Sequence, residues 1–327
     1  MTRLLSRDDV GAVLTLPDCI AAVEQVFGDY AMGSVPKSES LGIQAERGTF
    51  HVKAARADVF AAKINANFPA NPATHDLPTI QGVIVVMDLD RGTPLGILDS
   101  SLITTLRTAA ATAVAAKYLA RDDATIVALI GCGALGHATV DALRVVRPLK
   151  RVNLWDVNET ARAGCARELA RSRNLEIVPA ASLETALAGA DIVVTCTPAK
   201  RPFLEAHHAR PGLFIAAVGA DNPEKSEITP QLMTRTSVVT DLTDQAAAMG
   251  DLHHAIAAGF LTKSDVHGEL GEVISGRVAG RQTDDQIFLF DSTGTALQDV
   301  VVASLALDRA TRSGLGIEMA FTGPGVG

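Results

Sequence analysis

Short apolar runs alternate with amphipathic stretches over the C-terminal two thirds of the chain. Each run is about as long as a strand and apolar enough to be buried on both faces of a sheet. This pattern predicts helices over 159–172 and 183–189 and strands over 124–130, 151–156, 175–178, 191–197, 213–219, 237–241 and 287–290. Strands and helices that alternate in this way indicate an α/β fold with a doubly wound parallel sheet of roughly six strands.

Residues 1 to about 100 show a different pattern. Turn signals such as the segment 90–92 separate short apolar segments without regular strand and helix alternation. The pattern predicts a helix over 17–30 and strands over 48–54, 59–64 and 82–88. This part of the chain is therefore expected to form a separate α+β layer.

Two apolar helices connect these parts. An alanine-rich helix is predicted over 102–120, ahead of the first parallel strand, and another over 296–311 follows the last one and can pack back on the first part. A chain of 327 residues exceeds what one core usually holds. The expected domains are residues 117–304 for the parallel sheet and residues 1–116, completed by a C-terminal helix over about 305–327, for a discontinuous α+β domain.

The first predicted parallel strand runs into a glycine-rich turn, ATIVALIGCGALG over residues 124–136. Gly131 permits a tight turn, Gly133 lets the backbone approach a pyrophosphate, and Gly136 allows close packing of helix and strand. GxGxxG alone is a weak signal, because glycine-rich turns also occur where nothing binds. Here it follows a strand, opens a helix and lies in a βαβ unit of the expected length, which indicates a Rossmann dinucleotide site.

Asp156 ends the second predicted strand, twenty residues after Gly136. A carboxylate there accepts hydrogen bonds from the ribose hydroxyls of NAD and repels the 2′-phosphate of NADP, and residues 157–159 supply no arginine. The cofactor is therefore expected to be NAD(H). The expected cofactor contacts lie on the turn, at later strand ends and in the joining helix: Arg107, Thr108, Gly131, Gly133, Ala134, Leu135, Gly136, Asp156, Thr197, Val218, Ser292 and Thr293.

Composition and charge narrow the class of partner. The net charge of −8, without a lysine or arginine cluster, argues against a nucleic-acid surface or a polybasic membrane patch. No run of eighteen apolar residues and no signal-peptide core occur, so a cytoplasmic protein with a small-molecule partner is expected. The cysteines, which lack metal-like spacing, are expected to form neither a disulfide nor a metal site: Cys19, Cys132, Cys165 and Cys196.

Several polar residues stand where chemistry is expected, and each has a structural alternative. Arg107 lies in a helix stretch, residues 100–116, that is otherwise uncharged, and it suits a substrate carboxylate, or else a structural ion pair. Lys63 lies in an apolar strand and can bind the substrate or extend from a sheet edge. Asp221 follows a parallel strand and can act as acid or base, or cap a turn. Ser292 and Thr293 can reach the nicotinamide amide or cap the next helix.

In combination, the motifs resemble those of the ornithine cyclodeaminase/mu-crystallin family over nearly the whole chain. They are Pro36-Lys37, the strand lysine Lys63, LRTAAATAVAAKYLAR over 106–121, GCGALG over 131–136, VGADNPEKSEI from Val218, ELGEVISG from Glu269 and FDSTGTALQD from Phe290. The resemblance implies a homodimer formed by the N-terminal domain beside a Rossmann domain. It also implies that Lys63 and Arg107 hold the substrate carboxylate and that Asp221 is the catalytic acid or base.

The family contains cyclodeaminases, amino-acid dehydrogenases or imine reductases, and the binding protein mu-crystallin, which lacks the matching aspartate. Asp221 is present here, which favours catalysis, and the motifs are most similar to the alanine dehydrogenase branch. Lys37 stands where an arginine is usual, and His51 stands where ornithine cyclodeaminases have a glutamate, with Lys53 on the same strand face. A histidine and a lysine suit a second carboxylate, unless they face solvent or a dimer partner.

These observations predict an NAD(H)-dependent imine reductase or amino-acid dehydrogenase acting on a small 2-imino acid. Iminosuccinate, which would give aspartate, is the dicarboxylate example. Lys63 and Asp221 are the expected catalytic residues, and the expected substrate contacts are Lys37, His51, Lys53, Lys63, Thr79 and Arg107. Two alternatives stay open: an ornithine cyclodeaminase that recycles NAD⁺ while forming proline and ammonia, and a non-catalytic binding protein like mu-crystallin.

Overall fold

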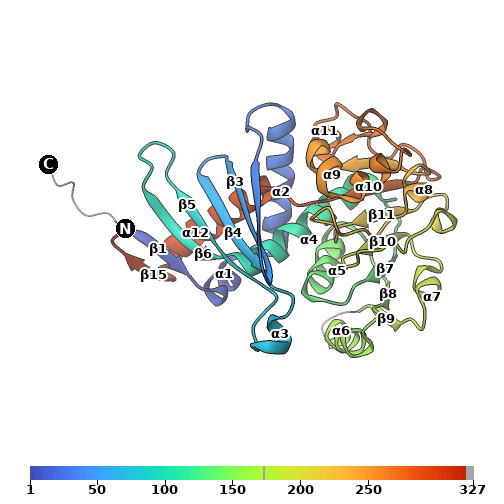
Figure 1. Ribbon diagram of the computed structural model, residues 1–327, viewed down its shortest axis with the longest axis horizontal. Helices are drawn as coiled ribbons and strands as arrows, with labels where there is room; N and C mark the ends of the chain where they lie inside the picture. The colour runs from blue at the N-terminus through green and yellow to red at the C-terminus, as the bar shows by residue number, and fades with distance from the viewer. Residues whose placement is uncertain (172–173, 322–327) are drawn as a thin grey trace. The chain divides into compact units, whose positions relative to one another are not determined.

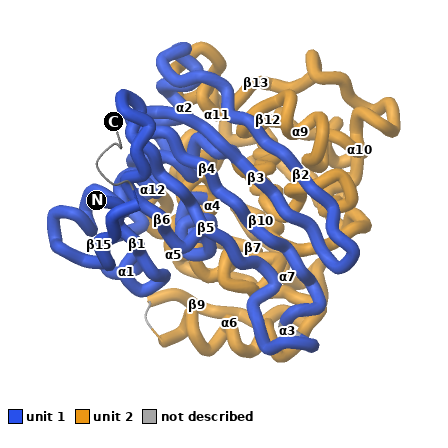
Figure 2. Tube along the Cα trace, turned by 60° about the vertical axis from the view of Figure 1, so that its left-hand side comes forward, with its two compact units in different colours: residues 1–107, 295–327 blue, residues 108–294 orange. Residues whose placement is uncertain are grey.

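The computed structural model describes residues 1–171 and 174–321 (Figure 1). The chain divides into two compact units, coloured separately in Figure 2. Unit 1 comprises Met1–Arg107 and Thr295–Gly327, and unit 2 comprises Thr108–Gly294. The division falls within helix α4 (Ser100–Leu119). Each unit has its own sheet, built as different sequence patterns require.

Unit 2 is a doubly wound α/β unit, as the sequence predicts. Within the described residues its sheet has eight strands in the order β13-β12-β14-β11-β10-β7-β8-β9, and every strand pair is parallel. The strands are β7 (Ile126–Ile130), β8 (Arg151–Trp155), β9 (Glu176–Pro179), β10 (Ile192–Thr195), β11 (Phe214–Ala217), β12 (Ser237–Thr240), β13 (Gly268–Glu269) and β14 (Phe288–Asp291). The chain runs from β7 outward to β9 and then returns to β10, so the topological switch point lies between β7 and β10, where ligands of such sheets bind.

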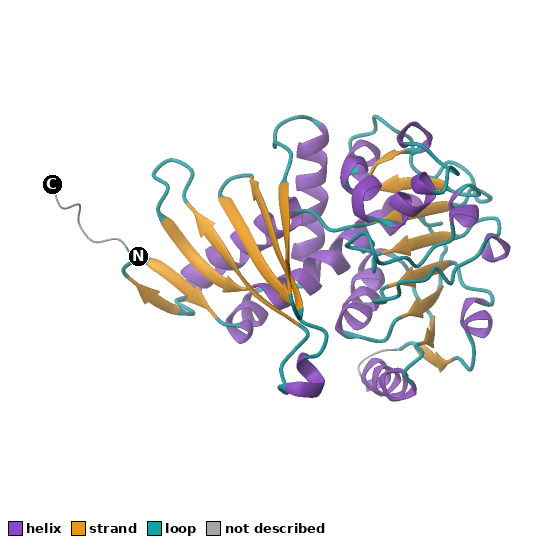
Figure 3. Cartoon of the chain, in the orientation of Figure 1, coloured by secondary structure: helices purple, strands orange, loops and turns teal. Residues whose placement is uncertain are grey.

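Helices flank the parallel sheet of unit 2 (Figure 3). They are α5 (Ala134–Val146), α6 (Glu159–Arg171), α7 (Leu183–Leu187), α8 (Pro230–Met233), α9 (Thr243–Met249), α10 (Asp251–Ala257), α11 (Leu270–Ile274) and the short 3₁₀ helices η1 (Ala206–His208) and η2 (Lys263–Asp265). The strands carry the largest fully buried side chains, among them Phe214, Phe288 and Phe290. The sequence pattern did not predict β13, because a two-residue strand leaves no periodicity to detect.

Unit 1 is an α+β unit whose sheet has the order β15-β1-β6-β5-β4-β3-β2 in the described chain. Its strands are β1 (Thr2–Leu5), β2 (Glu39–Ala45), β3 (Gly48–Arg56), β4 (Phe60–Asn67), β5 (Ile80–Met87), β6 (Pro94–Asp99) and β15 (Ile317–Met319). Its helices, besides the start of α4, are α1 (Arg7–Val13), α2 (Leu16–Ala31), α3 (Asn71–Thr74) and α12 (Ala296–Ser313). Helix α12 packs across β3 and β4 and beside α2, so the last helix of the chain covers the first sheet (Figure 1).

The register of unit 1 separates two faces of the sheet. Lys53 lies opposite Lys63, and His51 lies opposite Asn65, so these four side chains share one face. The opposite face carries an apolar row across four strands, in which Leu41 pairs with Val52, Val52 with Ile64, and Ile64 with Val83. One face is thus polar in its middle, and the other is apolar.

The C-terminal segment differs from the expected helix over about 305–327. Helix α12 begins at Ala296, as the apolar pattern over 296–311 predicts, and ends at Ser313, because Gly314 adopts the left-handed conformation with φ +69° and closes the helix. The chain then forms β15, which pairs antiparallel with β1. Residues 322–327 lie outside the described residues.

In the described part of the chain, no single helix is long and apolar enough to cross a membrane. Helices α1 and α2 reach that length and hydropathy only together, and the pair is bent by 86°. The apolar side of α2 is already covered, since Val23 and Phe27 are fully buried in the core of unit 1. The apolar character of α2 is that of a core helix.

A buried arginine fixes the end of α4 within unit 2. One terminal nitrogen of Arg147, Nη2, donates to the carbonyl oxygens of Ala116 (2.8 Å), Lys117 (2.9 Å) and Ala120 (3.0 Å). The last carbonyls of a helix have no partner inside the helix, so a side chain that reaches them satisfies buried groups. Lys117 and Ala120 gain a donor in this way, whereas Ala116, which already accepts the backbone N–H of Ala120, gains a second one. Arg147 therefore anchors α4 just before the first parallel strand.

Replacing Arg147 with methionine should lower the free energy of unfolding of unit 2 by about 2–3 kcal/mol, because buried carbonyls lose their donor. Urea denaturation followed by the fluorescence of Trp155, the single tryptophan, measures this in unit 2. Arg144→Met is the matched control, since Arg144 lies on the preceding turn with a distant 3.9 Å ion pair, and it should change stability by less than about 0.5 kcal/mol. Equal effects of the two variants would contradict the anchoring role.

Candidate functional site

The glycine turn of unit 2 has the geometry that the motif predicts. Gly131 has φ +107°, and a Cβ there would lie 2.8 Å from the carbonyl oxygen of Cys196. A Cβ on Gly136 would lie 2.5 Å from the carbonyl oxygen of Gly131, so only glycine lets α5 approach the turn. Gly133, which precedes the first residue of α5, has nothing within 4 Å of its Cβ position. Open space at the amino end of a 13-residue helix is suited to a phosphate group.

The first residues of α5, Ala134 and Leu135, follow this open space and contribute backbone N–H groups at the helix start. Beside the turn, Asp156 ends β8 and is half-buried. Its carboxylate accepts hydrogen bonds from the backbone N–H of Cys132 (2.8 Å) and of Asn158 (2.8 Å). These bonds tie the end of β8 to the glycine turn and fix the carboxylate at the switch-point edge of the sheet.

Ser292 and Thr293 follow β14 and are held by a carboxylate rather than used as helix caps. The hydroxyls of Ser292 and Thr293 donate to Asp241 over 3.2 Å and 3.1 Å, and the backbone N–H of Thr293 donates to it over 2.9 Å. Gln245 adds a hydrogen bond of 2.7 Å to the hydroxyl of Thr293. Asp241 is fully buried, so this loop is fixed from inside the unit.

Thr197 follows β10, which borders the switch point, and Val218 follows β11, the neighbour of β10. The backbone N–H and the hydroxyl of Thr197 both donate to Glu227 over 2.7 Å. The backbone N–H of Val218 donates to the carbonyl of Thr195 over 2.9 Å. Glu227 lies in the motif that starts at Val218, but its buried position, which gives it a role, cannot be inferred from the spacing of residues.

Asp221 also lies beyond the carboxyl end of β11. Its carboxylate forms an ion pair of 2.7 Å with Lys225 and accepts a hydrogen bond of 3.3 Å from Asn222. Half of its side chain is exposed. The aspartate is therefore accessible at the same edge of the sheet as Gly131, where an acid or base can meet a ligand.

Unit 1 contains a buried cluster in which two cations share one carboxylate. Lys63 Nζ lies 2.7 Å from Asp299 Oδ2, and Arg107 Nε donates to Asp299 Oδ1 over 2.9 Å. Arg107 Nη1 donates to Gln298 over 2.6 Å, and Lys63 Nζ donates to Thr104 over 3.3 Å. Strand β4, helix α4 and helix α12 supply the side chains, so the cluster depends on the last helix covering the first sheet.

Burial sets the protonation of this cluster. It lowers the pKa of Lys63 to about 7, although the nearby Asp299 carboxylate opposes the shift. Burial by itself would raise the pKa of Asp299, but the Lys63 ammonium and the Arg107 guanidinium bring it below its usual value. Asp299 is therefore ionised at neutral pH, whereas the pKa of Lys63 lies near neutrality. Gln298 and Asp299 lie in the motif that starts at Phe290, but neither was predicted as a site residue, because both contact residues distant in the sequence.

Of the remaining predicted substrate contacts, Lys53 lies near this cluster, whereas Lys37 and Thr79 lie at the ends of strands. Lys53 is close enough to influence the pKa of both Lys63 and Asp299, and it lies on the face of the sheet that carries Lys63. Lys37 is exposed in the loop before β2, and Thr79 is half-buried at the bend before β5. The register places these two at opposite ends of the strands. Thr108, the first residue of unit 2, is buried in α4.

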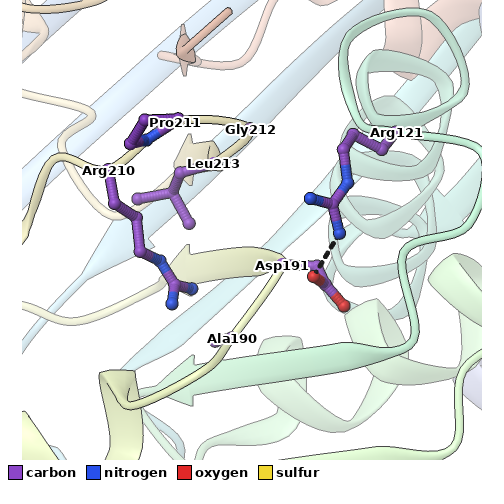
Figure 4. A pocket seen from close by; sticks show the side chains of 7 residues that line it. All are labelled: Arg121, Ala190, Asp191, Arg210, Pro211, Gly212 and Leu213. Carbon is purple, nitrogen blue, oxygen red and sulfur yellow. Dashed lines mark hydrogen bonds and ion pairs between the residues drawn. The ribbon is translucent and has the colours of Figure 1, made fainter. Parts of the chain in front are cut away.

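A small pocket of about 80 Å³ lies elsewhere in unit 2, at the amino ends of β10 and β11 (Figure 4). Arg121 and Arg210 line it with Asp191, whose carboxylate forms a 2.7 Å ion pair with Arg121. Asp191 also accepts the backbone N–H groups of Thr125 and Ile126. The pocket is opposite the edge where parallel sheets bind ligands, so this ion pair has a structural role.

Over residues 1–171 and 174–321, no group of three or more histidine, cysteine or acidic side chains is arranged to hold a metal ion. The cysteines are all free thiols. The candidate chemistry therefore comes from two places, the switch-point edge of unit 2 and the cation cluster of unit 1.

Three enzymes are similar to this chain, in sequence and in solved structure, over nearly its whole length. An alanine dehydrogenase from Archaeoglobus fulgidus is 32% identical over 322 residues, which cover 98% of each chain. The structure of an archaeal alanine dehydrogenase dimer with bound NAD matches this structure with a TM-score of 0.93 and covers 98% of this chain and 99% of that one. The iminosuccinate reductase of Paracoccus denitrificans is 30% identical over 324 residues, 97% of this chain and 99% of that one, and its structure with NAD⁺ has a TM-score of 0.87. The Δ¹-pyrroline-2-carboxylate reductase of Thermococcus litoralis, solved with NADH and L-proline, is 27% identical, covers 97% of this chain and 100% of that one, and has a TM-score of 0.93.

The family model of the ornithine cyclodeaminase/mu-crystallin family matches residues 1–314, nearly the whole chain. The relatives above cover both units, not the parallel sheet alone. The chain therefore belongs to the ornithine cyclodeaminase/mu-crystallin family.

Proposed function

We propose that this protein is an NAD(H)-dependent imine reductase, reversible as an amino-acid dehydrogenase, acting on a small 2-imino acid. The observation that carries the proposal is the buried cluster of unit 1, in which Lys63 and Arg107 form ion pairs with the two oxygens of the Asp299 carboxylate. Asp299 keeps both cations in place, and a substrate carboxylate is the kind of anion that their remaining donors recognise. An α-carboxylate is common to all 2-imino and 2-amino acids.

Unit 2 supplies the features that a dinucleotide needs. The open space at Gly133 suits the pyrophosphate, and the carboxylate of Asp156 suits ribose hydroxyls rather than a 2′-phosphate. Thr197, Val218, Ser292 and Thr293 follow strands at the same edge. Three relatives were solved with NAD, NAD⁺ or NADH, which supports NAD(H) as the cofactor here.

In the proposed reaction, bound NADH supplies the hydride that converts the imine carbon to the α-carbon of an amino acid. Arg107 and Lys63 hold the α-carboxylate and so orient the prochiral carbon. Asp221, or water that it orients, supplies the proton to nitrogen during reduction and accepts it in the reverse direction. Because the pKa of Lys63 is about 7, its ammonium form can hold the carboxylate and its neutral form can accept a proton during turnover.

The side chain of the substrate is proposed to carry a second carboxylate. Lys53 lies on the same sheet face as Lys63 and influences the cluster electrostatically, and His51 is two residues away on that face. A cationic strand of this kind suits an anionic side chain. Iminosuccinate has that chemistry, and a relative of similar length is an iminosuccinate reductase.

A homodimer is proposed from the apolar face of the unit 1 sheet. The side chains of Leu41, Ile43, Phe50, Ile64 and Val83 are between 39% and 58% exposed there. A contiguous apolar row across four strands is unusual on the surface of a monomer and is typical of a protein interface. An archaeal alanine dehydrogenase of the same fold was solved as a dimer.

The substrate proposal predicts NADH oxidation with a 2-oxoacid and ammonia, with oxaloacetate preferred over pyruvate. Lys53→Ala should lower kcat/KM for oxaloacetate by about tenfold or more, because the second carboxylate loses a charged partner, and should leave pyruvate nearly unchanged. Pyruvate, which lacks that carboxylate, is the matched control, and Lys53→Arg should retain most of the preference. A preference unaffected by Lys53→Ala would refute the dicarboxylate assignment, and proline formation from ornithine without net NADH change would refute the reductase.

The acid/base role of Asp221 predicts that Asp221→Asn lowers kcat by about 100-fold or more, because proton transfer is lost. NADH affinity, measured by fluorescence, should change by less than about twofold, since the side chain projects from the strand edge without supporting the glycine turn. Glu224→Gln is the control, because Glu224 lies on the same loop and only pairs with the exposed Lys200. Unchanged turnover in Asp221→Asn would exclude this residue as the acid or base.

The dimer proposal predicts that the 34.1 kDa chain has about twice that mass in solution by light scattering after gel filtration. The double variant Leu41→Lys, Ile64→Lys places charges in the apolar row and should shift the protein to the monomer mass. Leu89→Lys is the control, because Leu89 is 43% exposed but lies in the turn after β5. A wild-type monomer, or a double variant that stays dimeric, would contradict the proposed interface.

A further inference from the structure

Glu227 is a fully buried acid that joins the ends of β10 and β11. Its Oε1 accepts the backbone N–H and the hydroxyl of Thr197, both over 2.7 Å. Its Oε2 accepts the hydroxyl of Thr195 over 2.7 Å and the backbone N–H of Gly219 over 2.9 Å. One carboxylate thus fixes the last residue of β10 and the residues two positions beyond each strand, Thr197 and Gly219.

The backbone around Glu227 leaves room for this carboxylate. A Cβ on Gly219 would lie 2.6 Å from Glu227 Oε1 and 2.5 Å from the carbonyl oxygen of Thr197. Only glycine therefore allows the end of β11 to approach the carboxyl group so closely. The contact holds the backbone itself rather than a movable side chain.

Two further buried carboxylates extend this support to β14. Asp251 accepts the backbone N–H groups of Glu227 (2.8 Å) and Ile228 (3.1 Å). Asp291 in turn accepts the backbone N–H of Leu252 over 2.8 Å. The backbone of the segment that carries Glu227 is therefore held by Asp251, and the positions of the ends of β10 and β11 depend on the hydrogen bonds that Glu227 accepts.

The strand ends that Glu227 holds lie at the switch point of the sheet. Strand β10 neighbours β7, whose end forms the glycine turn, and β11 neighbours β10. We propose that Glu227 is a positioning residue whose ionised carboxylate holds Thr197 directly, and Val218 through the adjoining Gly219, for cofactor binding, so that its protonation weakens the binding of NAD(H). This inference rests on the proposed function, since it takes NAD(H) as the ligand of that edge.

The charge of Glu227 matters because two of the groups that donate hydrogen bonds to it are backbone N–H groups. A backbone N–H can only donate, so it cannot accept a proton from a protonated carboxyl group. A protonated carboxyl group keeps at most one of its oxygens as a strong acceptor and must donate its own proton to a threonine hydroxyl. Hydrogen bonds to an ionised group are roughly twice as strong as those to a neutral one, so protonation weakens the hold on Thr197 and Gly219.

The protonation change falls in an accessible pH range. Burial raises the pKa of Glu227 to about 7, and the neighbouring Asp251 raises it further, against the hydrogen bonds from Thr197 and Thr195. The other titratable groups near it are the Cys196 thiol at the end of β10, and His254 and Asp291, which act on Asp251. Because the folded-state pKa lies above the ordinary value, the carboxylate form predominates above about pH 7 and is lost below it.

The test is the dissociation constant of NADH, measured by fluorescence between pH 6 and 9 without any substrate. For the wild-type protein it should rise about tenfold as the pH falls through 7, because the charged hydrogen bonds weaken. Glu227→Gln, which is neutral throughout, should bind as weakly as the wild type at pH 6 and show a flat profile. Glu224→Gln, on the same loop but exposed and paired with Lys200, should keep the wild-type profile.

A second variant separates positioning from folding. Thr195→Val keeps the shape of a buried strand residue but removes one hydrogen bond to the carboxylate, so the midpoint of the NADH profile should move up by about one pH unit. A merely structural threonine would not move this midpoint. An unmoved midpoint, or a wild-type profile in Glu227→Gln, would overturn the role of Glu227. Failure of the wild type to bind NADH at any pH would instead overturn the proposed function.

Discussion

A charge that is taken out of water needs partners, and this constraint organises the chemistry-bearing parts of both units. In unit 1, the buried cations Lys63 and Arg107 are held by the single carboxylate of Asp299. In unit 2, the buried carboxylates of Asp241 and Glu227 are held by backbone N–H groups and hydroxyls at strand ends. Buried charges of this kind are strongly destabilising when one partner is removed, so they fix the geometry around them.

The two units carry complementary chemistry. Unit 2 has the parallel sheet, the glycine turn and the acidic residue that ends β8, which together are suited to a dinucleotide. Unit 1 has an antiparallel region whose polar face carries the cations and whose other face is apolar. Helix α12 links these features, because it follows the last parallel strand and delivers Asp299 to the first sheet. Along the sequence, one helix thereby joins the last parallel strand of unit 2 to the cation cluster of unit 1.

Local signals made part of this structure predictable. The parallel strands of unit 2 and the glycine turn follow from apolar runs and glycine spacing, which depend only on neighbouring residues. Strand β2 was not predicted, because it is exposed along its whole length, which leaves no buried pattern. Strands β1, β6 and β15 of unit 1 were not predicted either. In the cation cluster, the two cations could be predicted from the sequence, but their shared carboxylate could not. Lys63 and Arg107 stood out as charges in apolar segments, whereas Asp299, which is 192 residues from Arg107, gains its role only through tertiary packing. Asp241 and Glu227 were missed for the same reason.

The proposed function requires that a hydride pass from NADH to the α-carbon of an amino-acid product. Incubation of the enzyme with NADH deuterated at C4 of the nicotinamide, a 2-oxoacid and ammonia, followed by mass spectrometry and NMR of the product, tests it most directly. The account predicts one deuterium at the α-carbon when the transferred position is labelled, with one NADH consumed for each amino acid formed. An amino acid without deuterium from either labelled face, or product formation without net consumption of NADH, would contradict it.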